Sequence, residues 1–366
     1  MNIPQAVASM TALMSLGALA STAPAHATDV GTLDASAIAA EVAATSPSSA
    51  ELAELSTLEQ ITQLNRCVQL ATERYCIGLG FVDVDPSYER LAKAANAAPV
   101  SEPTGDMSTA DWVRTRLEMS DAERIKAEQD EIDVALAGVE KARYERLRTE
   151  ITQSEGFSQA DIGTQAAVGG PYIIMNGYET KQATRYYCGP ATMQSIDWGD
   201  PGDDGVKDTQ NTWADILGTT SGSGTSISAL VSTTNSSTTW DNKVGSYIVG
   251  SVSSWNTATW YDKHWNHFGG NPDARSRKAP IIEHVMLYTD YFPYLTENHG
   301  GHFQVGRGAK WARETDPKTI YYFEVYNEND WPENEDARTD TWGPRTIASS
   351  TYLNATKRHA QENIGY

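Results

Sequence analysis

The pattern of apolar and polar positions divides the chain into two parts. From residue 28 to about residue 165, Ala, Leu, Glu and Arg recur at helical spacing. The run from 108 to 151 predicts helix from end to end, and Ser120 opens a second S-x-x-E capping pattern within it. A further amphipathic helix is predicted over residues 49–76. We therefore expect a mainly helical N-terminal domain over residues 28–165.

The second part has a different pattern. Nine of the ten tryptophans follow residue 169, and helical periodicity gives way to short apolar runs such as "KVGSYIVG", "GHFQVGRG" and "TIYYFEVYN". Gly- and Asn-rich turns separate these runs, which is typical of short strands. A second, sheet-containing domain is therefore predicted over residues 166–366.

The first residues carry features of an export signal. Residues 6–21 are apolar and too few to span a bilayer comfortably, and Ala25 and Ala27 form a small-x-small cleavage pattern. No Lys or Arg precedes the run, so a plain apolar helix is the alternative. We expect a signal peptide over residues 1–27, a secreted protein, and no transmembrane segment after cleavage.

The expected export bears on the redox state of the three cysteines. Export favours a disulfide between Cys67 and Cys76, because a nearby pair bridges in an oxidising environment. Their spacing does not match a zinc knuckle. Cys188 is then unpaired, and it is open to three interpretations: a buried inert thiol, an intermolecular bridge, or a nucleophile.

Charge and metal motifs add exclusions. A formal net charge of -20 argues against nucleic acid or an anionic membrane as the main partner. The H-x-x-H pairs His264/His267 and His299/His302 lack the neighbouring Glu of a zinc helix motif. The acidic run after Asp200 departs from a calcium loop at its third and twelfth positions, Gly202 and Asn211. No metal or organic cofactor is expected.

The residues around Cys188 fit a nucleophile. Pro190 is tolerated only in the first turn of a helix, so a helix is predicted to begin at or beside Cys188. Its free amides would favour a thiolate. Gln182, six residues earlier, is a candidate to donate an amide N–H. With the backbone N–H of Cys188 it would form a two-donor oxyanion hole.

A glutamine six residues before Cys-Gly-Pro-Ala resembles the bacteriocin-processing (double-glycine) peptidases and their secreted relatives of papain-like fold. In that family a histidine opens a later strand and an Asp or Asn ends the next one. Here His302 opens "HFQVGRG", and Asn327 closes "TIYYFEVYN". Asp316 and Asp330 are rivals for the third role. The resemblance covers roughly residues 172–327.

The resemblance implies a papain-like α+β domain in which the Cys188 helix packs on an antiparallel sheet. It implies a thiol-dependent peptidase that uses Cys188, His302, Asn327 and Gln182. Amidase, isopeptidase or cross-linking chemistry on cell-wall material is an alternative, and so is an inactive surface or binding module. The helical half is either a pro-segment that covers the cleft or a companion domain. Trp198 and Trp331 are candidates to roof the site.

Overall fold

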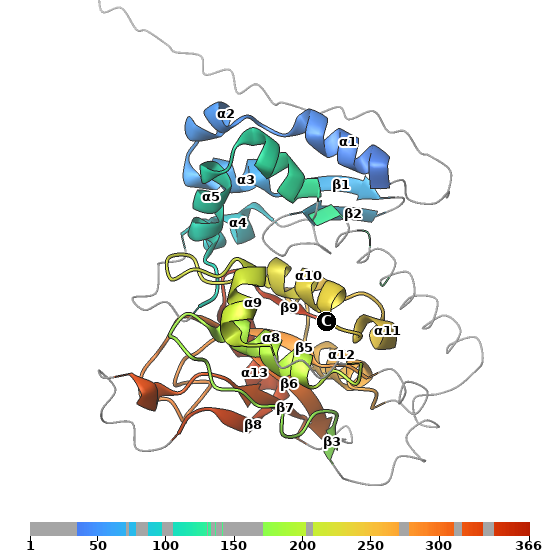
Figure 1. Cartoon of the computed structure of the whole chain (residues 1–366), viewed down its shortest axis with the longest axis vertical. Helices are drawn as coiled ribbons and strands as arrows, with labels where there is room; N and C mark the ends of the chain where they lie inside the picture. The colour runs from blue at the N-terminus through green and yellow to red at the C-terminus, as the bar shows by residue number, and fades with distance from the viewer. Residues whose placement is uncertain are drawn as a thin grey trace, which may run out of the picture. The chain divides into compact units, whose positions relative to one another are not determined.

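The computed structural model describes residues 35–70, 73–77, 87–96, 105–129, 131–132, 136, 141, 171–202, 208–270, 278–310, 317–331 and 340–366. Leu33–Tyr366 belong to one compact unit. This unit is a mixed α+β structure, with a helical N-terminal region and a C-terminal antiparallel sheet packed with helices (Figure 1). The predicted signal peptide, residues 1–27, lies outside the described residues.

Serine caps set the helix starts of the N-terminal region. Its helices are α1 (Ala35–Thr45), α2 (Ser49–Ala53), α3 (Thr57–Leu64), α4 (Tyr88–Ala95) and α5 (Thr109–Glu118). A serine precedes each of α2 to α5, and its hydroxyl accepts the N–H three residues on. Their apolar sides meet in a small core of Leu52, Ile61, Leu64, Leu91, Trp112 and Val113.

Two helix predictions in this region are corrected. The helix predicted over 108–151 is interrupted after Glu118, because the Ser120 hydroxyl and the Glu123 carboxylate form a new capping box. The helix predicted over 49–76 ends at Leu64, and a hairpin of β1 (Arg66–Leu70) and β2 (Glu73–Ile77) follows. Its Val, Tyr, Cys and Ile residues favour strand over helix.

The hairpin brings the two N-terminal cysteines together along the backbone. Cys67 and Cys76 are directly opposite each other in the antiparallel register. Opposed residues have Cα atoms about 4.5–5.5 Å apart, a separation that a disulfide tolerates. Their side chains are not among the described ones, and the disulfide stays a prediction.

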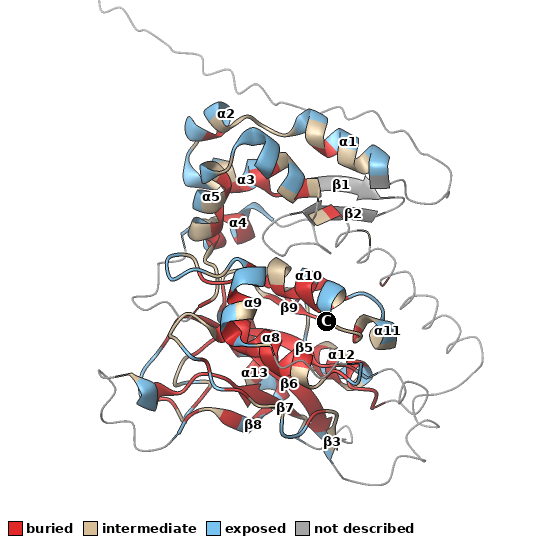
Figure 2. Cartoon of the chain, in the orientation of Figure 1, coloured by how far each residue is buried: buried red, intermediate tan, exposed pale blue. Residues whose placement is uncertain are grey.

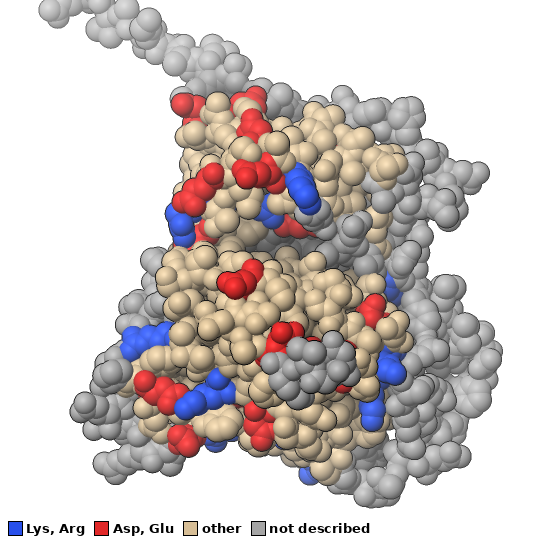
Figure 3. Space-filling view, in the orientation of Figure 1, with Lys and Arg blue, Asp and Glu red and all other residues tan. Residues whose placement is uncertain are grey.

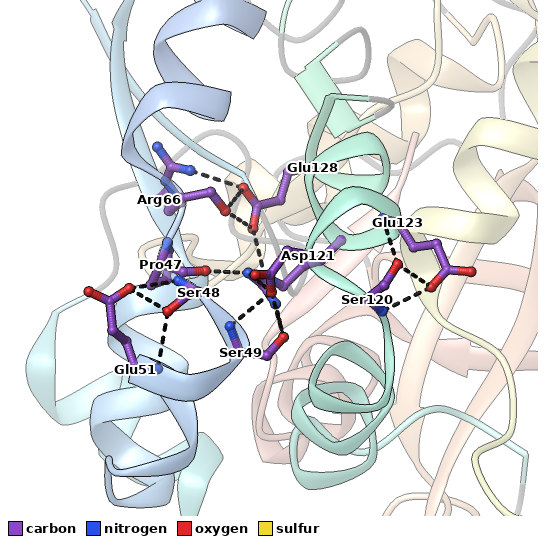
Figure 4. A network of polar contacts seen from close by, with 11 residues as sticks. Pro47, Ser48, Ser49, Glu51, Arg66, Ser120, Asp121, Glu123 and Glu128 are labelled. Carbon is purple, nitrogen blue, oxygen red and sulfur yellow. Dashed lines mark hydrogen bonds and ion pairs between the residues drawn. The ribbon is translucent and has the colours of Figure 1, made fainter.

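A buried polar network ties the N-terminal helices together (Figure 4). The side chain of Arg124 is fully buried; its guanidinium donates to the Ser49 hydroxyl at 2.7 Å and to the Pro47 carbonyl. Glu128 accepts from Arg66 at 2.9 Å and from the Ser46 hydroxyl. Because these charges are out of water, each depends on its partners to offset desolvation.

The C-terminal sheet is antiparallel throughout, in the order β4-β9-β5-β6-β7-β8, with β3 also paired to β6. Its strands are β3 (Pro171–Ile173), β4 (Val249–Ser251), β5 (Ile281–Met286), β6 (Gly301–Lys310), β7 (Thr319–Glu324), β8 (Gly343–Ala348) and β9 (Asn363–Gly365). A bulge between Gly306 and Gly308 shifts the register of β6 against β7.

Helices cover both faces of this sheet. They are α8 (Cys188–Trp198), α9 (Gln210–Leu217), α10 (Ile227–Ser237), α11 (Asp241–Val244), α12 (Thr257–His267) and α13 (Ser349–Arg358). Phe303 and Val305 pack in one core with α8, α9 and α10. Val285 and Tyr322 point the other way, into a core with α12 and α13. The central strands and α8 are accordingly buried (Figure 2).

Two basic side chains of helix α4, Arg90 and Lys93, bond it to the sheet domain. Arg90 donates to the Ser251 hydroxyl at 2.7 Å and to the Gln361 carbonyl at 2.5 Å. Lys93 forms an ion pair with Glu362, whose backbone has the unusual φ of 50°. These contacts hold the N-terminal region against the loop that enters β9.

The surface carries acidic groups on the face drawn in Figure 3, where Asp and Glu gather over the N-terminal helices and Lys and Arg are scattered. Among the described residues, none of the helices has the length and apolarity needed to cross a membrane.

The Arg124 network predicts an unequal cost for two arginine substitutions. Arg124→Met removes a buried cation and leaves its partners without a donor, so we expect the free energy of unfolding to fall by about 3 kcal/mol. Arg114→Met is the matched control, because Arg114 is 48% exposed in its ion pairs with Asp111 and Glu118. That change should cost less than about 1 kcal/mol. Urea unfolding of both variants measures the difference, and equal losses would contradict the network's structural role.

Candidate active site

Cys188 begins helix α8, as the Gly-Pro pattern predicted, and Pro190 occupies the first turn. The thiol is fully buried. Two backbone N–H groups approach its sulfur, one from Gly189 in the same turn and one from Phe303 in β6. Because the Phe303 nitrogen is bonded directly to His302, the sulfur lies beside the main chain of His302.

The electrostatics around the sulfur are mixed. Burial raises the pKa of the Cys188 thiol well above its ordinary value. The Phe303 and Gly189 N–H groups act to lower this pKa, whereas the negative charges of Asp106 and Glu324 act to raise it. In this state the thiol is therefore held protonated.

His302 is oriented by a buried carboxylate. Its Nε2 atom lies 2.7 Å from Glu324 Oε1, and both side chains are fully buried. The Nδ1 atom of His302 is also buried, and it has no hydrogen-bond partner among the described residues. One ring nitrogen is thus fixed by an acid. The ring lies on the face of the sheet away from Cys188, because Phe303, the next residue of β6, packs on the α8 side and side chains alternate along a strand.

Glu324 is bonded by four donors. Besides His302, the Tyr326 N–H reaches Oε1 at 2.9 Å, and the Tyr294 hydroxyl and Gln304 amide each reach Oε2 at 2.6 Å. Burial acts to raise the pKa of Glu324, but the charge of His302 and these hydrogen bonds outweigh it and hold the pKa below its ordinary value. The carboxylate is therefore ionised beside His302.

The third member of the predicted site is corrected. Asn327 lies past the end of β7, where its amide donates to Asp330 and Asp340 and its oxygen accepts the Thr341 N–H at 3.0 Å. It braces a turn and has no bond to His302. Asp330 pairs with Lys181, and Asp316 lies outside the described residues. Glu324, at the end of β7, is the carboxylate that bonds His302.

Gln182 is placed beside the site but is engaged elsewhere. Its backbone N–H donates to the Val325 carbonyl at 2.8 Å, which fixes its loop against the end of β7. Its side-chain amide donates to the carbonyls of Thr184 and Arg185 at 3.0 and 3.1 Å. Both amide hydrogens are thus used within its own loop, so an oxyanion role would require one of these bonds to open.

The two tryptophans proposed as a roof differ in position. Trp198 ends α8, about 15 Å along the helix from Cys188, so it does not cover the thiol. The Arg185 guanidinium lies over Trp331, 5.2 Å from the centroid of the Trp331 ring. Arg185 is three residues before Cys188.

A segment of the N-terminal region, Gly105–Met107, packs against residues around the thiol. Its position is fixed by contacts on three sides. A Cβ on Gly105 would lie 2.6 Å from the Tyr186 main chain, and one on Gly301 would lie 2.3 Å from the Asp106 carboxylate. The Gly105 carbonyl accepts the Thr225 N–H, and the Met107 N–H donates to the Thr225 carbonyl, both at 2.7 Å.

The Asp106 carboxylate is held by two histidines. Its Oδ2 atom lies 2.8 Å from His359 Nε2 and 3.4 Å from His284 Nε2. Burial acts to raise the pKa of Asp106, but hydrogen bonds from His284 and His359 outweigh it, so the pKa is held well below its ordinary value. His284 in turn bonds Asn363 Oδ1 through Nδ1 at 2.8 Å and stacks on Phe303 at 4.4 Å.

Asp106, His284 and His359 are also close enough to share a metal ion, and they form such a group among the described residues. The hydrogen bonds account for the arrangement in another way. His359 Nδ1 accepts the Gln361 N–H at 3.2 Å, so Nε2 carries the ring proton and donates it to Asp106. A metal ligand would need a lone pair at that atom.

The predicted H-x-x-H pairs are divided among separate partners. On α12, His264 bonds Glu283 at 2.9 Å, while His267 bonds the Ala279 carbonyl at 3.1 Å. His299 bonds Glu328 at 2.7 Å, and His302 bonds Glu324. The Asp200 carboxylate accepts hydrogen bonds from the N–H and hydroxyl of Thr239 and from the Gly202 N–H. Asp200 therefore stabilises its loop.

The sequence reasoning missed the acid partner and the covering segment. Glu324 had a detectable signal, because a carboxylate in the middle of the aromatic strand "TIYYFEVYN" is expected to have a buried partner. Asp106, His284 and His359 are far apart in the chain, at separations that no local motif spans.

Comparison with protein-family models, with curated proteins and with solved structures found no match to this chain. The family resemblance therefore rests on the residues around Cys188 and His302.

The buried histidine at Asp106 predicts loss of stability in acid. The pKa of His359 is lowered from 6.5 to about 4, first by burial and then by the neighbouring His284. Between these values the unfolded chain binds a proton that the folded chain does not, so the free energy of unfolding falls as the pH falls. From about pH 7 to about pH 5 the wild type should lose about 1–2 kcal/mol more than His359→Gln.

Urea unfolding of both proteins at each pH measures this difference. His267 acts in the same direction, because its pKa is also lowered well below the ordinary value by burial, and it is present in both proteins and cancels. Parallel pH profiles would show that His359 is not held neutral in the folded protein.

Proposed function

We propose that this chain is a secreted cysteine peptidase of papain-like type. The observation that carries the proposal is the buried Cys188 thiol at the start of α8, whose sulfur receives the N–H of Phe303, the residue after the Glu324-bonded His302. A nucleophile at a helix N-terminus, a base and an acid that orients the base are the three parts of thiol-dependent acyl transfer.

In the proposed reaction, His302 Nδ1 takes the proton of Cys188 as the sulfur adds to the carbonyl carbon of a peptide bond. This step requires the His302 ring, which lies on the α13 face of the sheet, to move toward α8. The backbone N–H of Cys188, with Gln182 once its amide is released, stabilises the oxyanion. The C–N bond then breaks as His302 returns the proton to the leaving amine. Water, deprotonated by His302, hydrolyses the thioester and frees the thiol. Glu324 stabilises the imidazolium in both halves.

Glu324 replaces the expected Asn327 in this proposal, and the change has a physical consequence. An asparagine orients an imidazole without charge, whereas an ionised carboxylate also stabilises the imidazolium that forms when the thiol loses its proton. This effect counters the burial that disfavours the thiolate of Cys188.

The same groups would serve an amidase, an isopeptidase or a cross-linking acyl transferase, and an inactive binding module would keep the fold without turnover. Cleavage of a peptide library separates these possibilities. Because the thiol is fully buried and Asp106 lies close enough to act on it, the library should be tested with the wild type and with Asp106→Ala. We expect peptide cleavage that falls by at least about 10³-fold on Cys188→Ala in either background.

Absence of cleavage by both proteins would contradict peptidase activity. Cleavage that survives Cys188→Ala would exclude the proposed nucleophile.

Two buried His–Glu pairs allow a matched test of the acid. Glu324→Gln keeps an oxygen for His302 Nε2 but removes the charge, and kcat/KM should fall by about 10²-fold or more. Glu283→Gln is the control, because Glu283 of β5 is equally buried and bonds His264 of α12 at 2.9 Å. This control should keep kcat/KM within about threefold of the wild-type value.

Thermal unfolding of both variants shows that the folds are retained. Equal losses of kcat/KM in Glu324→Gln and Glu283→Gln would remove Glu324 from the mechanism. A His284→Gln variant that loses turnover while His302→Gln keeps it would transfer the base to His284.

A further inference from the structure

The segment Gly105–Met107 is bound by main-chain groups in the way an extended peptide is bound. Thr225 bonds the residues on both sides of Asp106, through its N–H to Gly105 and through its carbonyl to Met107. Such a pair of bonds forms a single bridge of parallel β-structure. The recognition of this backbone is therefore independent of its side chains.

The surface that contacts this segment has room only for a close backbone. Gly224, opposite the Gly105 carbonyl, would place a Cβ 2.5 Å from that oxygen, so only glycine fits there. Gly105 has φ +106° and packs against Tyr186 with no room for a side chain. On the far side of Thr225, its side chain contacts Gly189, the residue after the thiol. Thr225 therefore separates the bound segment from the first turn of α8, and the Asp106 charge is close enough to act on the Cys188 thiol.

The only side chain of this segment with a polar pocket of its own is Asp106. His359 and His284 converge on one of its oxygens, and both histidines are almost fully buried. Asn363 and the Gln361 N–H hold the two rings from behind.

We propose that Gly105–Met107 occupies the peptide-binding groove of the Cys188 site as a tethered pseudosubstrate, and that His284 and His359 form a subsite for an acidic side chain. The substrate class is an extended peptide with Asp or Glu preceded by glycine, because no side chain fits at the position of Gly105. The segment keeps the thiol covered until it is displaced. The substrate part of this proposal rests on the proposed peptidase function, whereas the binding part does not.

The first test measures how far Asp106 covers the thiol. The probe is the rate at which iodoacetamide alkylates Cys188 in the full chain, followed by mass spectrometry of the peptide that contains it. We expect Asp106→Ala to raise this rate at least tenfold and Asp290→Asn, which alters an exposed acid, to leave it unchanged. If Asp106→Ala does not fold, Asp106→Asn, which keeps the size of the side chain, carries the same test.

The second test measures the subsite by binding alone. In the Asp106→Ala chain, a synthetic peptide with the sequence of residues 105–112 should slow alkylation of Cys188. The same peptide with Asn in place of Asp106 should need at least a tenfold higher concentration. Adding His359→Gln should abolish the difference between the two peptides, because the main donor to the carboxylate at 2.8 Å becomes a neutral amide.

The outcomes separate this proposal from the proposed function. Equal protection by the Asp and Asn peptides, or an unchanged alkylation rate in Asp106→Ala, overturns the subsite even if the protein cleaves peptides. Faster alkylation with selective protection, but without cleavage of any peptide, supports the subsite and refutes the peptidase. Stoichiometric zinc bound by the wild type and lost in His359→Gln would make Asp106, His284 and His359 a metal centre and overturn the proposal.

Discussion

The hydrogen-bonded carboxylate of Glu324 is the interaction on which the candidate site depends. A buried ionised acid is costly unless its oxygens are satisfied, and four donors satisfy it here. Those donors come from β6, from the chain after β7, and from the loop that carries Tyr294. Gln304 is held in turn by Tyr352 of α13 at 2.7 Å. The sheet and α13 thus fix the orientation of His302.

The two faces of the sheet have separate roles. The face under α8 carries Phe303 and the stacked His284, and it receives the thiol and the segment Gly105–Met107. The opposite face holds the polar network of Glu324 between the sheet and α13. His302 lies at the first residues of β6, where its main chain meets the sulfur and its side chain reaches the network. Strand β6 therefore links the main chain beside the Cys188 sulfur to Glu324, the carboxylate that bonds His302.

The N-terminal region adds an acid to a site that already contains a buried thiol. Asp106 acts to raise the pKa of Cys188, and the two histidines that hold Asp106 pay for its burial with hydrogen bonds. With Asp106 in place, burial and this negative charge act together to raise the pKa of the Cys188 thiol. The cation contacts of α4 with Ser251 and Glu362 keep this segment close to the groove.

Local signals in the sequence determined the parts of this protein that depend on neighbouring residues: the serine-capped helices, the start of α8 at Cys188, the strand that begins near His302, and the mixed α+β class. They failed where long-range packing decides. The hairpin after Leu64, Glu324 in place of Asn327, and the meeting of Asp106 with His284 and His359 all join residues through strand register or helix docking. Local propensity is a property of the chain, whereas the partner of a buried charge is set by which groups the folded core brings within hydrogen-bond distance.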